Sequence, residues 1–328
     1  MKLLTSDLRK FGAASSSIKK NNLMPILNYL KFDNGYITKN NLESFIIMKA
    51  DFTGSALIDE NILMSFVNFT NEKEITVTVK DKHLVISDGK SKVTSPTEDL
   101  SHFPVNVETD GDSVQFTSDV LYNLRSALGF TMDDKTMPFK EHVFIGNGLL
   151  SASTGFICFT QAVDKAIPET ILSRDASAAL IKFEEVTFSQ NDTYQFFQKD
   201  DFKYGFIKTD LKFLNMKLFS LLPEGDHIPV NKSELVKFCE ICINNTPSRI
   251  VSASSEGEKL VMVDKDYGVT IETPVSFNIG EFTFNPSIML KMLKSVPDEQ
   301  LKFVRAPSKY FVTGESGFVG LIMEIVKQ

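Results

Sequence analysis

The stretch Ser118-Asp119-Val120-Leu121 decides the fold, because it has a counterpart on either side at nearly equal distance. A polar residue followed by apolar residues at helical spacing is typical of a helix start. Ser6-Asp7-Leu8 lies 112 residues before it, and Asn231-Lys232-Ser233-Glu234-Leu235 begins 113 residues after it. In each segment the apolar positions share one helical face: Leu8, Phe11 and Ile18, then Leu121, Leu124 and Leu128, then Leu235, Phe238 and Cys242.

A second kind of helix start recurs in the same rhythm. Asp59, Ser173 and Asn285 each precede apolar residues at helical spacing, and they are separated by 114 and 112 residues. Pro286 stands in the first turn of the third segment, where its missing N–H costs nothing. Six signals in phase predict one unit of about 112 residues repeated three times, with helices over 6–20, 59–69, 118–128, 173–183, 231–243 and 286–295.

The segments between these helices are strand-like. Residues 74–80 alternate apolar and polar side chains, and Asp88-Gly89 and Asn147-Gly148 are hairpin turn signals. Residues 260–263 and 269–271 repeat the pattern in the last third. The fold class is therefore α+β, with two helices packed on antiparallel sheets in each of three repeated domains. We expect these domains at 1–111, 112–222 and 223–328, with polar linkers at 108–112 and 223–226.

Composition narrows the class of protein. The chain has 328 residues, 42% hydrophobic content, 28 Phe and no Trp, which favours large, well-packed cores. Its net charge of −7 argues against a simple DNA binder that relies on neutralising phosphates. Three sparse cysteines indicate reduced thiols in a cytoplasmic protein. The N-terminus lacks the apolar core of a signal peptide and no apolar run is long enough to span a bilayer, so no membrane partner is expected.

Residue patterns that carry chemistry are missing. The four histidines neither accompany a nucleophile motif nor form a metal-binding pair. Cys239-Glu240-Ile241-Cys242 is a Cys-x-x-Cys without a second ligand pair, so we interpret both thiols as helix packing. Phosphate-loop and dinucleotide fingerprints are absent. We therefore predict no catalytic residue, no metal, no cofactor and no enzymatic activity.

Charge is divided unevenly between the helices and the rest of the chain. The six predicted helical segments carry eleven basic and seven acidic residues, a net +4, which leaves −11 elsewhere. A positive excess on helices suits an anionic partner. Surface helices also carry lysines merely as a solvated face, and segment 59–69 has no basic residue. The basic residues of these segments are Arg9, Lys10, Lys19, Lys20, Arg125, Arg174, Lys182, Lys232, Lys237, Lys291 and Lys294.

Four motifs, in order along the chain, resemble those of the β subunit of bacterial DNA polymerase III, the sliding clamp. They are Leu23-Met24-Pro25-Ile26-Leu27, Asp99-Leu100-Ser101-His102-Phe103-Pro104, Ala127-Leu128-Gly129-Phe130-Thr131-Met132 and Leu218-Phe219-Ser220-Leu221-Leu222-Pro223. The chain departs from the family at 154–159 and at 323–328, where other residues replace its usual motifs. The resemblance therefore implies a divergent clamp, such as one encoded by a phage or plasmid.

This resemblance implies how the chain works. Each copy would form half of a ring, and a homodimer would encircle double-stranded DNA without reading its sequence and tether the polymerase as a processivity factor. The eleven basic residues of the predicted helices would face the DNA, and Lys19 and Lys20 would be the best DNA-facing candidates. The dimer interface would contain Phe103, Val105, Ile241 and Ile243. The polymerase and the clamp loader would dock short linear motifs in a groove at Thr154, Phe156, Phe159, Leu221, Ile325 and Val326.

Other interpretations stay open. Phe156 and Phe159 are equally compatible with ordinary strand core, and the four interface residues with the core of a single domain. A monomeric protein-interaction scaffold built from the same domains is the alternative function, and a stable monomer at micromolar concentration would support it. An enzyme with an unrecognised site is a third hypothesis, which a polymerase-stimulation assay on circular primed template would separate from a clamp.

Overall fold

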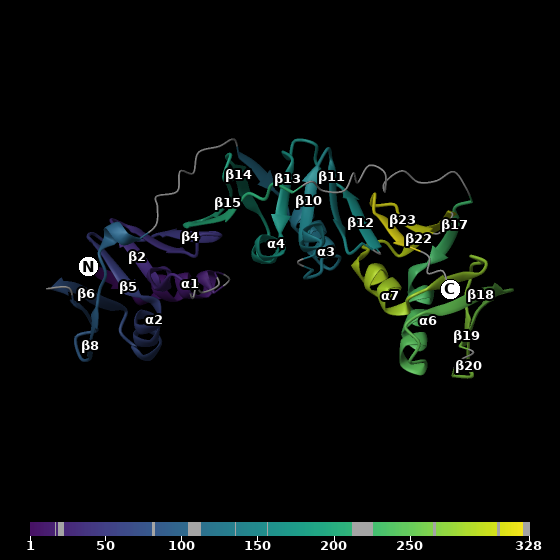
Figure 1. Ribbon diagram of the computed structural model, residues 1–328, viewed down its shortest axis with the longest axis horizontal. Coiled ribbons are helices and arrows are strands. Elements are labelled where there is room, and N and C mark those ends of the chain that lie inside the picture. The colour runs from purple at the N-terminus through teal and green to yellow at the C-terminus, as the bar shows by residue number, and fades with distance from the viewer. Residues whose placement is uncertain are drawn as a thin grey trace. The chain divides into compact units, whose positions relative to one another are not determined.

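The computed structural model describes the chain except for residues 17, 19–22, 81–82, 104–112, 135, 156, 212–225, 265–266, 307–308 and 324–328. In the described part, one order of elements occurs six times: a strand, a helix and three further strands (Figure 1). Two such repeats make one module, so the chain contains three modules with the same element order. This arrangement confirms the predicted α+β class with three repeated units.

The first module covers the described residues up to His102. Its first repeat contains α1 and its second α2, and the two helices pack against each other. The elements are β1 (Lys2–Leu4), α1 (Thr5–Ser15), η1 (Pro25–Asn28), β2 (Tyr29–Asp33), β3 (Tyr36–Asn40), β4 (Ser44–Lys49), β5 (Ser55–Asp59), α2 (Glu60–Phe69), β6 (Glu74–Lys80), β7 (His83–Ser87), β8 (Lys92–Pro96) and η2 (Leu100–His102).

The second module begins at Ser113 and repeats this order, with α3 packed against α4 and against β11. Its elements are β9 (Ser113–Phe116), α3 (Ser118–Leu128), η3 (Pro138–Glu141), β10 (His142–Gly146), β11 (Leu149–Ser153), β12 (Ile157–Ala162), β13 (Thr170–Ser173), α4 (Arg174–Leu180), β14 (Val186–Gln190), β15 (Tyr194–Lys199) and β16 (Phe202–Ile207).

The third module begins at Ile228, and here α6 packs against α7 and against β20. Its elements are β17 (Ile228–Asn231), α6 (Lys232–Asn245), β18 (Val251–Glu256), β19 (Lys259–Asp264), β20 (Val269–Pro274), β21 (Phe282–Phe284), α7 (Pro286–Ser295), β22 (Gln300–Ala306), β23 (Lys309–Gly314) and β24 (Val319–Met323).

Within each module the two repeats exchange their first strands. In the first module β1 joins β6, β7 and β8, while β5 joins β2, β3 and β4. Neighbouring modules then share a sheet, because β4 pairs with β16 and β12 pairs with β24, both antiparallel. The result is two eight-stranded sheets, β5-β2-β3-β4-β16-β15-β14-β9 and β13-β10-β11-β12-β24-β23-β22-β17, and two four-stranded sheets, β1-β6-β7-β8 and β20-β19-β18-β21.

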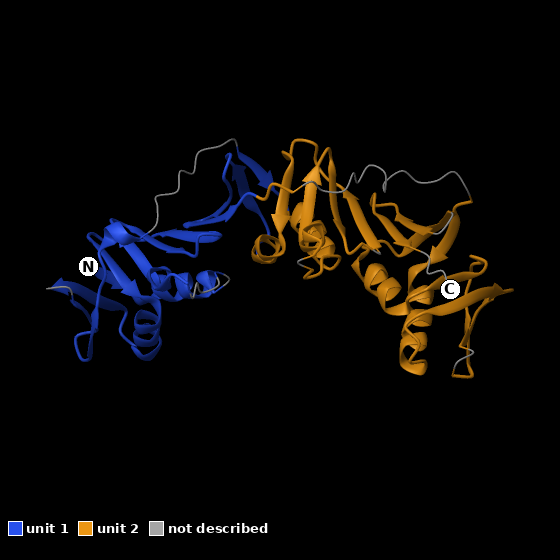
Figure 2. Ribbon diagram, viewed as in Figure 1, with its two compact units in different colours: residues 1–117, 183–208 blue, residues 118–182, 209–328 orange. Residues whose placement is uncertain are grey.

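Shared sheets explain why the compact units of the chain differ from its modules. Unit 1 comprises residues 1–117 and 183–208, and unit 2 comprises 118–182 and 209–328 (Figure 2). Each unit holds one eight-stranded and one four-stranded sheet, so the second module is divided between them. The predicted domain boundaries at 111–112 and 222–223 lie outside the described residues and stay predictions. The polar linker 108–112 and most of 223–226 lie there too.

The helix starts follow the predicted rhythm closely. The Asp59 side chain caps α2 by accepting from the amides of Asn61 and Ile62. Ser173 caps α4, Asn231 caps α6 and Asn285 caps α7 in the same manner, which satisfies amides that have no partner inside the helix.

Two helices are shorter in the structure than the sequence predicts. The helix expected over 6–20 begins one residue earlier and ends at Ser15, and neither Ser6 nor Asp7 caps it. The Thr5 hydroxyl instead donates to the carbonyls of Glu72 and Lys73, so contact with a distant loop fixes the start. The helix expected over 173–183 ends at Leu180.

Phenylalanine forms much of both cores, as its abundance predicts. In unit 1, Phe188 lies between Phe116 and Phe197, with ring centroids 4.9 and 5.1 Å away. In unit 2, Phe282 stacks on Phe284 at 4.7 Å. Aromatic rings bury large apolar area and need no hydrogen-bond partner, so they suit sheets covered on one face by helices. All three cysteines are free and buried.

Candidate functional site

The basic side chains of the first module divide into two kinds. Arg9 on α1 donates from Nη2 to the carbonyls of Val67 and Thr70, at 3.0 and 2.8 Å. These carbonyls lie at the C-terminus of α2, where a cation satisfies acceptors without helical partners. Lys10 is exposed, and its side chain makes no hydrogen bond or ion pair within the described chain. Lys19 and Lys20 lie outside the described residues.

The second module repeats this arrangement. Arg125 on α3 donates from Nη2 to the carbonyl of Ile181 at 2.7 Å, which closes the C-terminus of α4. Arg174 and Lys182 are exposed, and neither side chain makes a hydrogen bond or ion pair in the part of the chain that the structure describes. One cation therefore supports the fold, while two others project into solvent.

The third module has the densest group of predicted residues. Lys232 on α6 donates to the Val296 carbonyl at the end of α7 and pairs with Glu299 at 2.9 Å. Lys294 on α7 pairs with Glu240 on α6 at 2.8 Å. Lys237 is exposed and makes no side-chain hydrogen bond or ion pair among the described residues. Burial, and then the neighbouring charge of Arg174, lower the pKa of Lys291.

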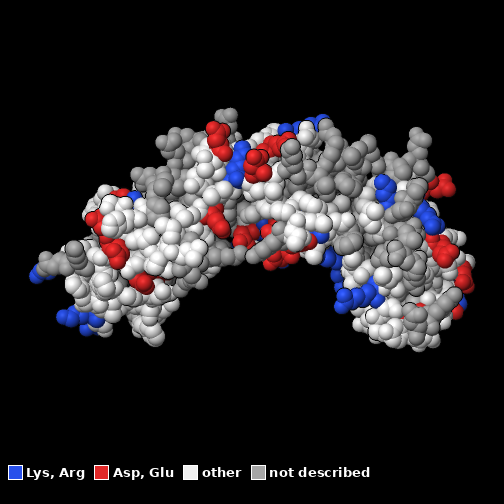
Figure 3. Space-filling model, viewed as in Figure 1, with Lys and Arg blue, Asp and Glu red and all other residues white. Residues whose placement is uncertain are grey.

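The positive excess over the described helices is smaller than the sequence predicts. Within their observed bounds the helices carry eight basic and six acidic residues, a net +2. In Figure 3, basic side chains gather over the part of unit 2 that contains α7. Arg9, Arg125 and Lys232 each close the neighbouring helix, so the residues best placed to attract an anion are Lys10, Arg174, Lys182, Lys237 and Lys291.

Two of the six predicted groove residues lie in the described chain. Thr154 occupies the turn between β11 and β12, and its hydroxyl accepts from the Ile157 amide at 3.4 Å. Phe159 on β12 is only 1% exposed, because Phe130 and Phe318 cover its ring with centroids at 5.2 and 5.4 Å. A contact between Phe159 and a partner would require these rings to move. Phe156, Leu221, Ile325 and Val326 lie outside the described residues.

Three of the four predicted interface residues are described. Phe103 follows η2 and is buried, at 7% exposure. Ile241 and Ile243 lie on the last turns of α6, where Ile241 is half-buried and Ile243 is 38% exposed. Val105 lies outside the described residues.

Sequence reasoning missed two sheet edges: among the described strands, β8 and β20 each pair on one side only. The strands β8 and β20 end the two four-stranded sheets, whereas their counterparts β16, β24, β4 and β12 are paired. It also missed Phe69, at the end of α2, which is 86% exposed. The signal for Phe69 was available, since it lies off the apolar face defined by Leu63 and Val67.

The strand order, the six repeats and the shared sheets define the class: this chain has the sliding-clamp fold. Over its whole length it is similar to three solved clamps from bacteria. The β sliding clamp of C. crescentus has a TM-score of 0.86 at 16% identity and full coverage of both chains. The DNA polymerase III β subunit of Pseudomonas aeruginosa gives 0.85, 17% and full coverage. The Bacillus subtilis clamp gives 0.84 at 16%, with 100% of this chain and 99% of the other covered.

The chain therefore has the fold of the bacterial DNA polymerase III β subunit, in a divergent sequence. No protein-family model matches it, and no curated protein matches it at the level of sequence. Among the described residues, none of the helices is long and apolar enough to cross a membrane.

Proposed function

We propose that this protein is a DNA sliding clamp, a homodimeric ring that encircles duplex DNA and holds a replicative polymerase on it. The strand order carries the proposal. The last strand of the first repeat in one module pairs with the last strand of the next module. This pairing occurs twice within the chain, as β4 with β16 and as β12 with β24. Among the strands that the structure describes, a third pairing of this kind is lacking, because β20 and β8 are sheet edges.

A second copy supplies what these edges lack. An unpaired edge exposes a row of amides and carbonyls, and proteins usually cover or pair such edges. The β20 strand of one copy would pair with β8 of the other, and the reverse pairing would follow by twofold symmetry. Six modules would then close through six equivalent junctions, four within the chains and two between them.

DNA would be held by the closed ring rather than by tight binding. The exposed cations Lys10, Arg174, Lys182 and Lys237 lie on or beside helices of all three modules. Each would make a loose contact with the phosphate backbone, weak and sensitive to salt. Such contacts carry no sequence information, which fits a ring that moves along the duplex.

The polymerase and the clamp loader would dock through short linear motifs near Thr154, on the turn that leads into β12. An extended peptide there would combine a few apolar anchors with backbone hydrogen bonds. The chain itself would perform no catalysis, and its contribution would be to keep an enzyme at its template.

Light scattering and a processivity assay test the proposal. At micromolar concentration we expect a particle of twice the chain mass, which is 36.8 kDa. With its polymerase and loader, the protein should lengthen products on a primed circular template and should have less effect on a linear one with free ends. A stable monomer that leaves product length unchanged would support the scaffold instead.

A further inference from the structure

The two junctions within the chain can serve as templates for the one between copies. The strands β4, β12 and β20 each have six residues and each follow a hairpin whose last pair is equivalent: Tyr36 with Lys49, Leu149 with Ala162 and Lys259 with Pro274. Their first residues are therefore equivalent as well. In the junctions, the first residue of β4, Ser44, pairs with Phe206, and that of β12, Ile157, pairs with Ile322.

The position in β8 that corresponds to Ile322 follows from the ladders. In the third module, Asn231 precedes α6 and pairs with the first residue of β22. The sixth residue of β22, Arg305, pairs with Tyr310, which in turn pairs with Ile322. In the first module, Leu4 precedes α1 and pairs with the first residue of β6. The sixth residue of β6, Val79, pairs with Leu84, which in turn pairs with Ser95. Ser95 therefore corresponds to Ile322.

We infer that β8 of one copy pairs with β20 of a second copy in a single register, with Ser95 opposite Val269, and that this register makes the protein select its own kind. The inference rests on the proposed ring. In this register Val93 faces Ile271, while Lys92 faces Glu272. Both charged side chains are exposed, and within its own chain Glu272 pairs with Lys259 at 3.0 Å, so Lys92 of the other copy would join an existing ion pair. Opposite charges directly across two strands stabilise the pairing, and a shift by two residues would separate them.

The helices beside the strands give a second, independent correspondence. At the junction of β12 with β24, Gly129 is the twelfth residue from the start of α3, and a Cβ built on it would lie 3.6 Å from Ser295 Oγ. Ser295 is the tenth residue of α7. The twelfth residue of α6 is Ile243 and the tenth of α2 is Phe69. The same correspondence therefore brings Phe69 of one copy against Ile243 of the other.

Exposure agrees with this pairing. Phe69 is 86% exposed and Ile243 is 38% exposed. Large apolar side chains that are open to solvent on two surfaces expected to meet indicate an interface. At the junction of β4 with β16, the residue ten positions after the helix cap is also a phenylalanine. That residue, Phe183, is half-buried and packs against Tyr204 at 5.6 Å. The equivalent ring is therefore partly covered by a strand of its own module, whereas the ring of Phe69 stays exposed.

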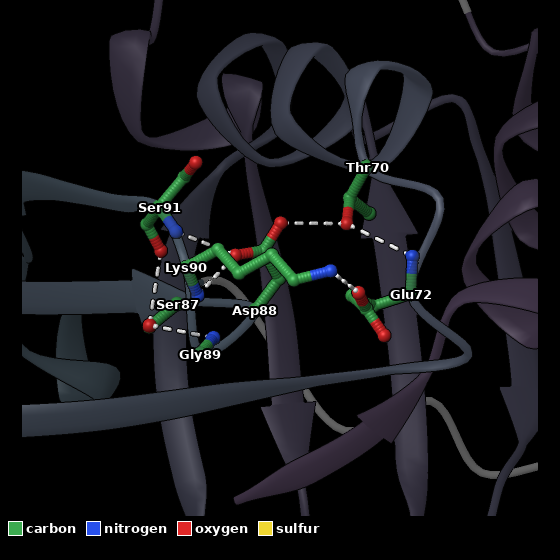
Figure 4. Close-up of polar contacts among 7 residues, drawn as sticks. All are labelled: Thr70, Glu72, Ser87, Asp88, Gly89, Lys90 and Ser91. Atoms are coloured by element: carbon green, nitrogen blue, oxygen red, sulfur yellow. Dashed lines mark hydrogen bonds and ion pairs between the residues drawn. The ribbon is translucent and has the colours of Figure 1, made fainter.

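Hydrogen bonds join the helix end to the edge-strand hairpin on both surfaces of the proposed interface. The Thr70 hydroxyl donates to Asp88 at 2.8 Å, and Asp88 accepts from the amides of Lys90 and Ser91 at 3.0 and 2.7 Å (Figure 4). This cluster ties the helix end that carries Phe69 to the turn before β8. In the third module Thr246 donates to Asp264, which ties the end of α6 to the hairpin of β19 and β20.

Disulfide trapping tests the register in the full chain. Thr94 and Thr270 are exposed and would lie directly opposite each other. The variant T94C/T270C should therefore form a covalent dimer under mild oxidation, since paired strands place Cα atoms within disulfide reach. P96C/T270C, shifted by two residues on the same face and keeping both Lys92 and Glu272, is the matched control and should trap several-fold less. Equal trapping by both variants, or more by the control, overturns the register.

Charge reversal and truncation test the contacts. K92E and E272K should each raise the dimer dissociation constant by about tenfold, because the pair occurs twice per ring, and K92E/E272K should restore it. F69A should weaken the dimer at least as much, while Y122A, an exposed aromatic on α3, should not. A dimer that tolerates all these changes overturns the inference and leaves the ring standing. A wild-type monomer overturns both.

Discussion

Thr70 Oγ1 donates a hydrogen bond of 2.8 Å to Asp88 Oδ2, joining the end of α2 to the turn between β7 and β8 across 18 residues of sequence. The same carboxylate accepts two backbone amides of its own turn. A helix end and a sheet edge are thereby fixed together, which matters because the edge strand β8 is where we place the contact with a second copy.

Asp88 should make stability depend on pH. The Ser91 amide first, and then the Thr70 hydroxyl, hold the pKa of Asp88 below its ordinary value of 3.8. A carboxyl whose pKa is lower in the folded state stabilises the fold above its unfolded pKa, and that stabilisation is lost as the pH falls through the folded value. D88N should therefore melt at a lower temperature than the wild type at pH 7, with the gap closing below about pH 4. D51N, at an exposed aspartate of the same unit, is the control and should melt like the wild type at pH 7.

Gly205 should be required at the junction of β4 with β16. A Cβ there would overlap the ring of Phe45, its partner across the ladder. G205A should therefore lower the free energy of unfolding by about 1–3 kcal/mol in urea denaturation. In an F45A background the same change should cost clearly less, because the overlapping ring is gone. Equal costs in both backgrounds would show that the ring is not the obstacle.

Neighbouring cations on α1 should have different effects. Arg9 closes the C-terminus of α2, so R9Q should lower the stability of the protein by about 1 kcal/mol. Lys10 makes no such contact, and on the proposed function K10Q should leave stability unchanged while it weakens binding to duplex DNA. The slope of log affinity against log salt should fall by about one for K10Q. An unchanged slope would remove Lys10 from the DNA-facing set.

Glu240 should moderate the charge of the third module. Its ion pair with Lys294 is exposed, with 45% and 58% of the two side chains accessible, so E240Q should change stability by less than about 1 kcal/mol. The released lysine should raise affinity for duplex DNA about two- to threefold at low salt, an effect that screening removes at high salt. E240Q/K294Q should show no gain. If it binds as tightly as E240Q, then Lys294 is not the residue responsible.

The three thiols should be unreactive while the chain is folded. Burial raises the pKa of Cys158 and Cys239, and it raises the pKa of Cys242 to about 12. Because the thiolate is the reactive form, a thiol reagent at pH 8 should label none of them quickly in buffer and all three in denaturant. Rapid labelling of one thiol in the native protein would contradict the burial of that residue.

Local signals predicted the elements well and their ends less well. Caps such as Asp59 and Asn285, and the turn at Asn147-Gly148, act through backbone groups only two or three residues away, so sequence alone reveals them. The turn needs two residues with positive φ, which Asn147 and Gly148 provide at 54° and 77°. The start of α1 could not be predicted, because Thr5 is held by carbonyls of the loop at Glu72 and Lys73.

The candidate site was predicted less well than the fold. Charge identified the helices that carry cations, but it could not separate Arg9, which binds carbonyls, from Lys10, which does not. Nor could an apolar strand pattern show that Phe159 is covered on the helix side by Phe130 and Phe318. Both distinctions depend on neighbours that are far away in sequence.

By itself, the sequence determined that one unit is repeated three times, since helix caps, turns and apolar spacing are local and recur at a fixed interval. Only the tertiary structure decided that the repeats exchange strands, that β4 joins β16 and β12 joins β24, and that among the described strands β8 and β20 end their sheets. The physical reason is that strand pairing joins residues distant along the chain through backbone groups that every residue carries, so side-chain patterns specify that a strand forms but not which strand it meets.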